Sequence, residues 1–430
     1  MREMKDSGIE WFGKIPKKWT IKPIKYLYTI RSGATPKSND NDSWDGNIVW
    51  VTPADFKTED KYISSGARNI SEKGYRTCNT TLVPEKSIIF SKRAPIGTVV
   101  LSKGKLCTNQ GCLSCVNNDT YNSLYYYYLM SILTEQFNLY GYGTTFMEIS
   151  ANNFANFKFV VPPKYEQDII AKYLDKECAK YELITKDIQR QIEVLQEYKQ
   201  SVITEAVTKG LDKNVAMKDS GIDWIGNIPQ HWAVKKIKYI GDSRNGLTYK
   251  PTDIVDENDG TLVLRSSNIQ DGKLTFNDNV YVSSIIPKNL KVKKDDILIC
   301  SRNGSRELIG KNTLIDNVDA TFGAFMMIYR CIAPRFIYYV LNSEVFKYYL
   351  GTFFTSTINQ LTGTNFNNMK IVFCPNEKER QKITNYLDKK CSKLDAIIAD
   401  KQKQLDTLTE YKKSLIYEYV TGKKEVPADA

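Results

Sequence analysis

Apolar residues recur at intervals of three and four along two long stretches of the chain, residues 164–209 and 376–421, neither of which contains Gly or Pro. Such spacing places side chains on one face of an α-helix. The apolar seam of the first stretch runs through Ile170, Leu174, Tyr181, Ile184, Ile188, Leu195, Tyr198 and Val202. After a constant displacement, the second runs through Ile383, Leu387, Leu394, Ile397, Leu408, Tyr411 and Leu415. The pattern predicts one long helix that occurs twice.

Each predicted helix would be roughly 60 to 70 Å long, more than a compact domain of half this chain needs. The narrow, nearly heptad seam is typical of two helices lying along each other. We therefore expect the two helices to pair in antiparallel fashion. The alternative is that each helix covers its own domain, although a covering helix usually has a broader apolar face and is shorter.

A shorter motif is also duplicated: MKDSGIEWFGKIPKKW at residues 4–19 returns as MKDSGIDWIGNIPQHW at residues 217–232. The Gly and Pro residues in each copy favour an ordered loop over a helix. Each copy also carries two tryptophans, Trp11 and Trp19 in the first and Trp224 and Trp232 in the second. We expect this aromatic segment to pack against a long helix in a structural role.

The stretch after each copy shows strand-like runs bounded by Gly, Pro, Asn and Asp, such as KSIIFSKRAPIGTVVL and DDILICSRNGSRELIGKN. The expected fold is therefore α+β with an internal pseudo-two-fold repeat. Two β-rich globular domains, residues 1–160 and 214–373, are joined by the two long antiparallel, coiled-coil-like helices, and the polar residues 422–430 form a disordered tail. The β-rich domains resemble each other far less than the motifs and helices do. This contrast suggests a common frame that holds two recognition domains, here called readers, which bind different things.

Composition changes this picture only modestly. The 60 basic and 49 acidic residues give a net charge of +11, which suits a polyanionic partner but is shared by many ordinary proteins. Nine cysteines, an odd number without a short disulfide-type spacing, fit a reducing compartment. The segment MREMKDSGIEW lacks the apolar core of a signal peptide, and no apolar run is long enough to cross a bilayer. We expect a cytoplasmic protein.

Residues for catalysis are scarce. His231 is the only histidine, which argues against Ser/His or Cys/His nucleophiles and most zinc hydrolase sites. The chain has no G-x-x-x-x-G-K-[ST] loop and no Asn-Pro-Pro-Tyr or Asp-Pro-Pro-Tyr segment. Cys112 and Cys115 form a single C-x-x-C near Cys107 without a second pair at zinc spacing, so buried thiols are favoured over a metal site. The sequence predicts a binding protein with no catalytic and no metal site.

The ordered, duplicated set of motifs resembles the specificity subunit of Type I restriction-modification enzymes. The set comprises the two tryptophan motifs; SGATP with NGLTYKP; VPEKSIIFSKRAPIG with VKKDDILICSRNGSRELIG; TNQG; and VPPKYEQDIIAKYLD with CPNEKERQKITNYLD. The second half departs from the pattern at Asn376, at Arg380 where Gln167 would be expected, and at TFGA, which replaces TNQG. These changes suggest that the second reader presents its loops differently.

The resemblance implies a non-catalytic subunit whose two target-recognition domains each read half of a split double-stranded DNA sequence. It also implies that the paired helices fix the distance between the halves and dock two methyltransferase subunits, which use S-adenosylmethionine to methylate adenine. Two endonuclease and translocase subunits can join that assembly. This chain itself would bind no cofactor.

Polar turns after predicted strands are the candidates for DNA contact, because such loops can reach a major groove where Arg reads guanine and Asn reads adenine. The alternatives are contacts to phosphates only, or salt bridges within the domain. The candidates are Thr35, Lys37, Ser91, Lys92, Arg93, Thr144, Thr145, Tyr249, Lys250, Ser301, Arg302, Asn303, Arg306, Thr355 and Asn359.

The Glu- and Lys-rich outer faces of the predicted helices are either only solvated or a surface for the methyltransferase. A contact surface needs apolar residues outside the seam, and Ile192, Ile398 and Leu405 are the candidates.

Because the frame repeats and the readers differ, the expected target is two unlike half-sites separated by a fixed, unspecified spacer. One rival is a coiled-coil scaffold whose β-rich domains bind proteins. Another is a DNA enzyme whose catalytic domain is missing from this chain.

Overall fold

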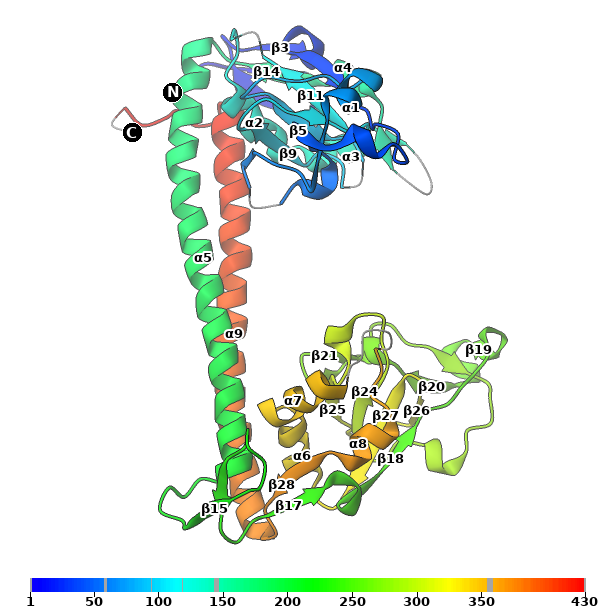
Figure 1. Ribbon diagram of the computed structural model, residues 1–430. Helices are drawn as coiled ribbons and strands as arrows, with labels where there is room; N and C mark the ends of the chain where they lie inside the picture. Colours follow the sequence, from blue (N-terminus) through cyan, green and yellow to red (C-terminus); the bar gives the residue numbers. More distant parts are fainter. Residues whose placement is uncertain are drawn as a thin grey trace. The chain divides into compact units, whose positions relative to one another are not determined.

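The computed structural model describes residues 2–57, 60–93, 95–117, 119–142, 147–353 and 359–428. The chain divides into two compact units (Figure 1). Unit 1 comprises Met1–Ile188 and Lys403–Ala430, and unit 2 comprises Gln189–Gln402. Each unit therefore combines a globular part with portions of both long helices.

Unit 1 is built on a five-stranded sheet in the order β4-β11-β8-β9-β6, in which only the β6/β9 pair is parallel. These strands are β4 (Thr29–Ser32), β11 (Cys112–Val116), β8 (Ile88–Ser91), β9 (Val99–Ser102) and β6 (Tyr62–Ile63). A second sheet has the order β10-β5-β7, with β10 (Cys107–Thr108), β5 (Trp44–Val51) and β7 (Arg68–Ile70). The strand pairs are β1 (Met4–Asp6) with β2 (Lys14–Pro16), β3 (Thr20–Pro23) with β14 (Lys158–Val161), and β12 (Gly141–Tyr142) with β13 (Glu148–Ile149). The helices are α1 (Glu72–Thr77), α2 (Ser123–Ser131), α3 (Thr134–Asn138), α4 (Ala151–Asn156) and the first part of α5 (Lys164–Lys209).

Unit 2 has two four-stranded sheets. The first, in the order β18-β27-β24-β25, is antiparallel throughout and contains β18 (Gly241–Asn245), β27 (Met326–Cys331), β24 (Ile297–Cys300) and β25 (Asn312–Leu314). The second contains β19 (Ile254–Val255), β23 (Tyr281–Val282), β20 (Thr261–Leu264) and β26 (Ala320–Phe322). The strand pairs are β15 (Met217–Asp219) with β16 (Asn227–Pro229), β17 (Ala233–Lys236) with β28 (Lys370–Phe373), and β21 (Ile269–Gln270) with β22 (Lys273–Leu274). The helices are α6 (Pro334–Leu341), α7 (Glu344–Phe353), α8 (Gly363–Asn368) and the first part of α9 (Glu377–Val420).

Short 3-10 helices connect these elements. They are η1 (Ile24–Tyr26), η2 (Asn41–Ser43), η3 (Pro53–Asp55), η4 (Ile237–Tyr239), η5 (Pro251–Asp253), η6 (Glu257–Asp259), η7 (Ser266–Asn268), η8 (Lys288–Leu290) and η9 (Arg306–Leu308). Among the described helices, none is both long and apolar enough to span a membrane.

The long helices run antiparallel in both units. In unit 1, contacts pair Tyr173 with Tyr419, at 4.6 Å between ring centroids, and Glu182 with Lys412, at 3.0 Å. In unit 2, Lys199 forms an ion pair with Asp395 at 2.5 Å. Residue numbers thus rise along α5 as they fall along α9. The predicted α+β fold with two long paired helices is confirmed.

The buried seam differs in detail from the predicted one. Ile184 and Tyr198 were assigned to it but are 45% and 47% exposed, whereas Ile192 is only 3% exposed. A heptad series of buried and partly buried residues runs along α5 through Leu174, Cys178, Tyr181, Ile188, Ile192, Leu195 and Val202. Ile184 lies one residue away from the heptad position that falls between Tyr181 and Ile188, and that position holds the polar Thr185.

This correction changes the candidate docking residues. Ile192 and Leu405 were expected outside the seam, but both are buried, and Ile398 is partly buried. Because buried side chains are not available to a second protein, Ile192 and Leu405 do not form an open apolar surface, and Ile398 is only partly exposed.

The duplicated tryptophan motif packs against a long helix, as predicted. In unit 1, the indole of Trp19 is fully buried and its Nε1 donates to Glu166 on α5 at 2.9 Å. In unit 2, Trp232 makes the same bond to Glu379 on α9 at 3.1 Å. Unit 1 also includes Lys423, which donates to the backbone oxygens of the first motif. The expected disorder of the tail is therefore wrong at this residue, because these bonds hold its side chain.

Candidate nucleic-acid interface

The loop that carries Thr35 and Lys37 has its backbone held in place by the rest of unit 1. A Cβ on Gly33 would lie 2.1 Å from the carbonyl oxygen of Thr108, so only glycine allows this approach. The indole of Trp50 donates to the oxygen of Ala34 at 3.0 Å, and Trp44 donates to the oxygen of Lys37 at 3.1 Å. The loop therefore presents its exposed side chains from a fixed backbone.

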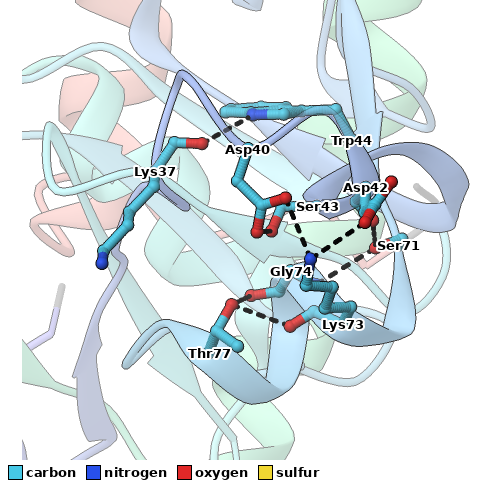
Figure 2. A network of polar contacts seen from close by, with 9 residues as sticks. All are labelled: Lys37, Asp40, Asp42, Ser43, Trp44, Ser71, Lys73, Gly74 and Thr77. Carbon is cyan, nitrogen blue, oxygen red and sulfur yellow. Dashed lines mark hydrogen bonds and ion pairs between the residues drawn. The ribbon is translucent and has the colours of Figure 1, made fainter.

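A polar network secures the far end of this loop (Figure 2). The ammonium of Lys73 lies 3.0 Å from Asp40 and 3.1 Å from Asp42, and Ser43 donates to Asp40 at 2.9 Å. The hydrogen bond from Lys73 is the main reason that the pKa of Asp40 is lowered, and the bond to Asp40 is the main reason that the pKa of Lys73 is raised.

The Lys37 ammonium points away from this network in Figure 2, and among the described residues it has no hydrogen-bond or ion-pair partner. Thr35 donates to Gln110. Lys37 is thus a cation on a rigid loop that is available to an anion.

Unit 2 repeats the close approach with different side chains. A Cβ on Gly246 would lie 2.2 Å from the oxygen of Gly323, and Leu247 donates to the oxygen of Phe322 at 2.7 Å. The loop continues through the partly buried Tyr249 to the exposed Lys250, whose backbone N–H donates to Asp253 at 2.9 Å. The predicted pair Tyr249 and Lys250 therefore occupies the same part of the fold as Thr35 and Lys37.

The turn Ser91-Lys92-Arg93 begins at the last residue of β8 and contacts two other loops. The N–H of Lys92 donates to Gly111, and its carbonyl oxygen accepts from Ile149, at 3.0 and 2.9 Å. Ser91 is buried and donates to the oxygen of Arg93, which closes the turn. The turn therefore lies between the segment that begins at Thr108 and the β12/β13 hairpin.

Glu148 neutralises part of this turn. Its carboxylate lies 2.7 Å from the ammonium of Lys92 and 2.8 Å from Nε of Arg93. Burial alone would raise the pKa of Glu148, but the hydrogen bonds from Lys92 and Arg93 lower it below its ordinary value. Lys92 and Arg93 therefore form salt bridges within the domain, which was one of the two alternatives to a base contact. The Arg93 side chain nevertheless remains half exposed.

The equivalent turn of unit 2 has a neutral partner. Leu361 donates to the oxygen of Ser301 at 2.7 Å, just as Ile149 donates to Lys92, and Gln360 forms a backbone bridge with Arg302. Gln360 therefore stands where unit 1 has Glu148. In the part of unit 2 that the structure describes, the Arg302 guanidinium has no acidic partner, and it lies 5.2 Å from the ring centroid of Phe325.

Neighbouring residues shape the same turn. Phe325 is 59% exposed, which is unusual for so large an apolar side chain. Asn303 is fixed by a bond of 3.1 Å from its amide to Ser266, while its oxygen accepts from the N–H of Ser305. Arg306 lies exposed at the start of η9. Unit 2 thus displays a cation on an aromatic platform where unit 1 displays a carboxylate held by two cations.

Comparison with known proteins shows which proteins this chain resembles. The model of the "Type I restriction modification DNA specificity domain" matches residues 16–194. The MjaIX specificity subunit of a Type I restriction enzyme from Methanocaldococcus jannaschii is 29% identical over 68% of this chain and 66% of its own length. The MjaVIII specificity subunit from the same organism is 23% identical over 96% of this chain and 94% of its own. The family model and these relatives support the assignment of the chain as a Type I specificity subunit.

A solved structure supports the fold of this specificity subunit. A chain from a study of complex assembly and conformational transition of the type I restriction-modification system superposes with a TM-score of 0.69 at 14% identity, covering 95% of this chain and 99% of that one. At that identity the likeness concerns the fold alone.

The other predicted residues of the specificity subunit fall in two groups. Thr144, Thr145 and Thr355 lie outside the described residues. Asn359 is exposed and directly precedes Gln360, so it lies beside the Arg302 turn. The predicted candidates that are described thus gather at corresponding turns of each unit.

Four residues at these turns were missed: Gln110, Glu148, Phe325 and Gln360. Gln110 is part of the quoted TNQG motif, and Phe325 directly follows TFGA, so their positions in the motifs were a usable signal. Glu148 and Gln360 had no such signal, because only the folded chain brings them to turns that are distant in sequence.

The three cysteines of the predicted C-x-x-C region are buried thiols. Cys107, Cys112 and Cys115 are fully buried. Burial raises the pKa of Cys107 to about 11 and those of Cys112 and Cys115 further. Such thiols carry little of the thiolate that nucleophilic or metal-binding cysteines need.

Proposed function

We propose that this specificity subunit reads a bipartite, asymmetric DNA target, one half-site with each unit, and has no catalytic role of its own. In the assembled enzyme it would dock two methyltransferase subunits, which supply S-adenosylmethionine chemistry, and through them the endonuclease and translocase subunits. The observation that carries the proposal is the pair of equivalent turns with unlike side chains, Lys92 and Arg93 on Glu148 in unit 1 and Arg302 beside Gln360 in unit 2.

Those side chains suit different bases. An exposed Arg such as Arg302 can donate two parallel bonds to guanine, and a Gln or Asn can pair with adenine in the same way. A carboxylate such as Glu148 can accept from the N4 amino group of cytosine. If these groups reach the major groove, the two units would prefer different sequences, which accounts for an asymmetric target.

The exposed lysines suit a second task. Lys37 and Lys250 extend from loops whose backbones are fixed by hydrogen bonds, and neither has an ion-pair partner among the described residues. Contacts from such cations to phosphates would set the orientation of each unit on the duplex without selecting a base. Base selection would then depend on the neighbouring turns.

The long helices support the idea of a fixed spacer. Each is continuous, with 46 residues in α5 and 44 in α9, and each begins in one unit and ends in the other. A paired helix resists bending better than a flexible linker does. We infer that helix length sets the number of unread base pairs between the half-sites.

The absence of catalysis is supported by the roles of the reactive residues. His231 contacts Glu379 at 2.8 Å, beside the buried Trp232, which is a structural position. The thiols of Cys107, Cys112 and Cys115 are buried.

Selection of bound duplexes from a random library tests the proposal. The chain, alone and with the methyltransferase encoded beside it, should enrich a split motif with a constant gap. Enrichment of no sequence, combined with normal binding of the methyltransferase, would instead favour the scaffold.

A further inference from the structure

An exposed tyrosine occupies the same position in both units. Tyr26 on η1 is 66% exposed and Tyr239 on η4 is 71% exposed. In each case the preceding lysine, Lys25 or Lys238, lies over the ring with its ammonium 5.4 Å from the centroid. Two large aromatic side chains are therefore held in the same arrangement at the protein surface.

The folding of η1 and η4 does not require a tyrosine at these exposed positions. The preceding residues Ile24 and Ile237 are fully buried, and their N–H groups donate to Phe157 and Met369 at 3.0 and 2.9 Å. Those bonds and buried side chains are enough to fix η1 and η4. An exposed tyrosine contributes little to such a core, and single exposed positions usually change freely.

The surroundings of this segment did change between the two copies. The sequence TIKPIKYLYT of the first half is AVKKIKYIGD in the second. Pro23 became Lys236 and Tyr28 became Gly241, yet the exposed Lys-Tyr pair is identical. The exposed Lys-Tyr pair is the same in two units whose recognition loops differ. This identity indicates a functional requirement that both units share.

The surface around each tyrosine is basic. Lys158 pairs with Pro23 across the β14/β3 ribbon, directly before η1, and Lys370 pairs with Lys236 directly before η4. Lys25 donates to Asn156 at 2.7 Å. Over the described residues, none of Lys25, Lys158, Lys238 and Lys370 has an acidic partner. We name Lys25, Tyr26 and Lys158 the unit 1 patch, and Lys238, Tyr239 and Lys370 the unit 2 patch.

The patches lie away from the reading loops. In unit 1, η1 precedes β4, and the Gly33 loop follows the other end of that strand. In unit 2, β18 separates η4 from the Gly246 loop in the same way. Strands of this length span about 13 to 17 Å. A patch at the opposite end of the strand from the reading loops is poorly placed to contact the bases read by its own unit.

We propose that the two patches are equivalent docking points for an acidic face of a protein partner that binds once to each unit. The inference rests on the proposed function, in which that partner is the methyltransferase subunit. Tyrosine is among the residues most often found to dominate binding energy at protein interfaces, and the lysines supply complementary charge. Identical patches explain how one kind of partner could bind two units whose readers differ.

Charge-reversed variants test this inference. Copurified complexes of the full chain with the neighbouring methyltransferase would be sized by native mass spectrometry. K25E/Y26A should remove one of the two partner copies, and K238E/Y239A should remove the other. The fourfold variant, which combines all four substitutions, should remove both copies. The Kd at each altered patch should rise by about tenfold or more. I285A/K288E is the matched control, since it makes the same kind of change at an exposed site outside the patches and should retain both copies.

Three results would overturn the inference. One is an unchanged number of partner copies in the fourfold variant. Another is equal loss in the control. The third is retention of both copies with weaker duplex binding and a shallower salt dependence, which would assign the patches to phosphates. If no complex enriches a split motif, the proposed function fails while the docking result still stands. If the motif appears but the fourfold variant keeps both partners, only this inference fails.

Discussion

Exchanging the acid and the amide at the two equivalent turns should shift DNA binding in opposite directions. Lys92, Arg93 and Glu148 form a cluster in which the carboxylate lies within 2.8 Å of both cations. The two cations and one anion give this cluster a net charge of +1. E148Q keeps the shape of the side chain but leaves +2. Q360E does the reverse, since it places a carboxylate next to Arg302, which has no acidic partner in the described part of unit 2.

The size of the effect follows from counterion release. Each additional cation that reaches a phosphate steepens the slope of log K against log salt by about 0.9. Between 50 and 200 mM salt, one additional contact therefore costs roughly 3.5-fold more affinity. E148Q should steepen the slope by about 0.9 and raise affinity for non-target duplex at low salt, whereas Q360E should make it shallower by about the same amount.

Fluorescence anisotropy would measure both variants on a target and a non-target duplex at five salt concentrations. Because Glu148 and Gln360 stand at equivalent positions, each variant is the other's control for the cost of substitution. Slopes and affinities equal to those of the wild type in both variants would refute the reasoning, since neither turn could then face DNA. A fall in affinity without a change in slope would instead mean that the turn is misfolded or reads a base.

Three other predictions follow from the helices and the thiols. Inserting seven residues in the middle of both long helices keeps the heptad seam and lengthens each by about 10 Å, so the unread gap should grow by about three base pairs in a duplex selection, whereas an unchanged gap would contradict the spacer role. I192A should lower the free energy of unfolding by about 2 to 5 kcal/mol in a urea titration, because it empties a buried position, while V194A at an exposed position should cost under about 0.5 kcal/mol; equal costs would contradict the revised seam. With its pKa raised to about 11, Cys107 should react with iodoacetamide at pH 8 at least about 100-fold more slowly than in urea, and equal labelling measured by mass spectrometry would contradict its burial.

The sequence was sufficient for the features that repeat with a fixed period. The two long helices, their pairing and the packing of Trp19 and Trp232 all follow from local spacing and from the duplication. The exact face of the helix was not predictable in the same way. Ile184 and Ile192 both fit an apolar stripe, and contact with the other helix decides which is buried.

The candidate turns show the same limit. Lys92 and Arg302 were identified because polar residues follow an apolar strand. Their partners, Glu148 and Phe325, lie far away or in another motif, so their effect on charge and exposure depends on tertiary contacts. A sequence can therefore indicate candidate turns before it indicates the charge that those turns present.

The central claim is that each unit reads its own half-site, and duplex selection with two variants of the methyltransferase complex tests it most directly. R302A removes the cation of the unit 2 turn, and K92A/R93A removes the two cations of the equivalent unit 1 turn. Loss of a base contact costs about 1 to 3 kcal/mol and relaxes the position it reads. The account predicts that R302A relaxes only one half of the split motif and K92A/R93A only the other. Relaxation of the same half by both variants, or enrichment of one contiguous motif by the wild type, would contradict it.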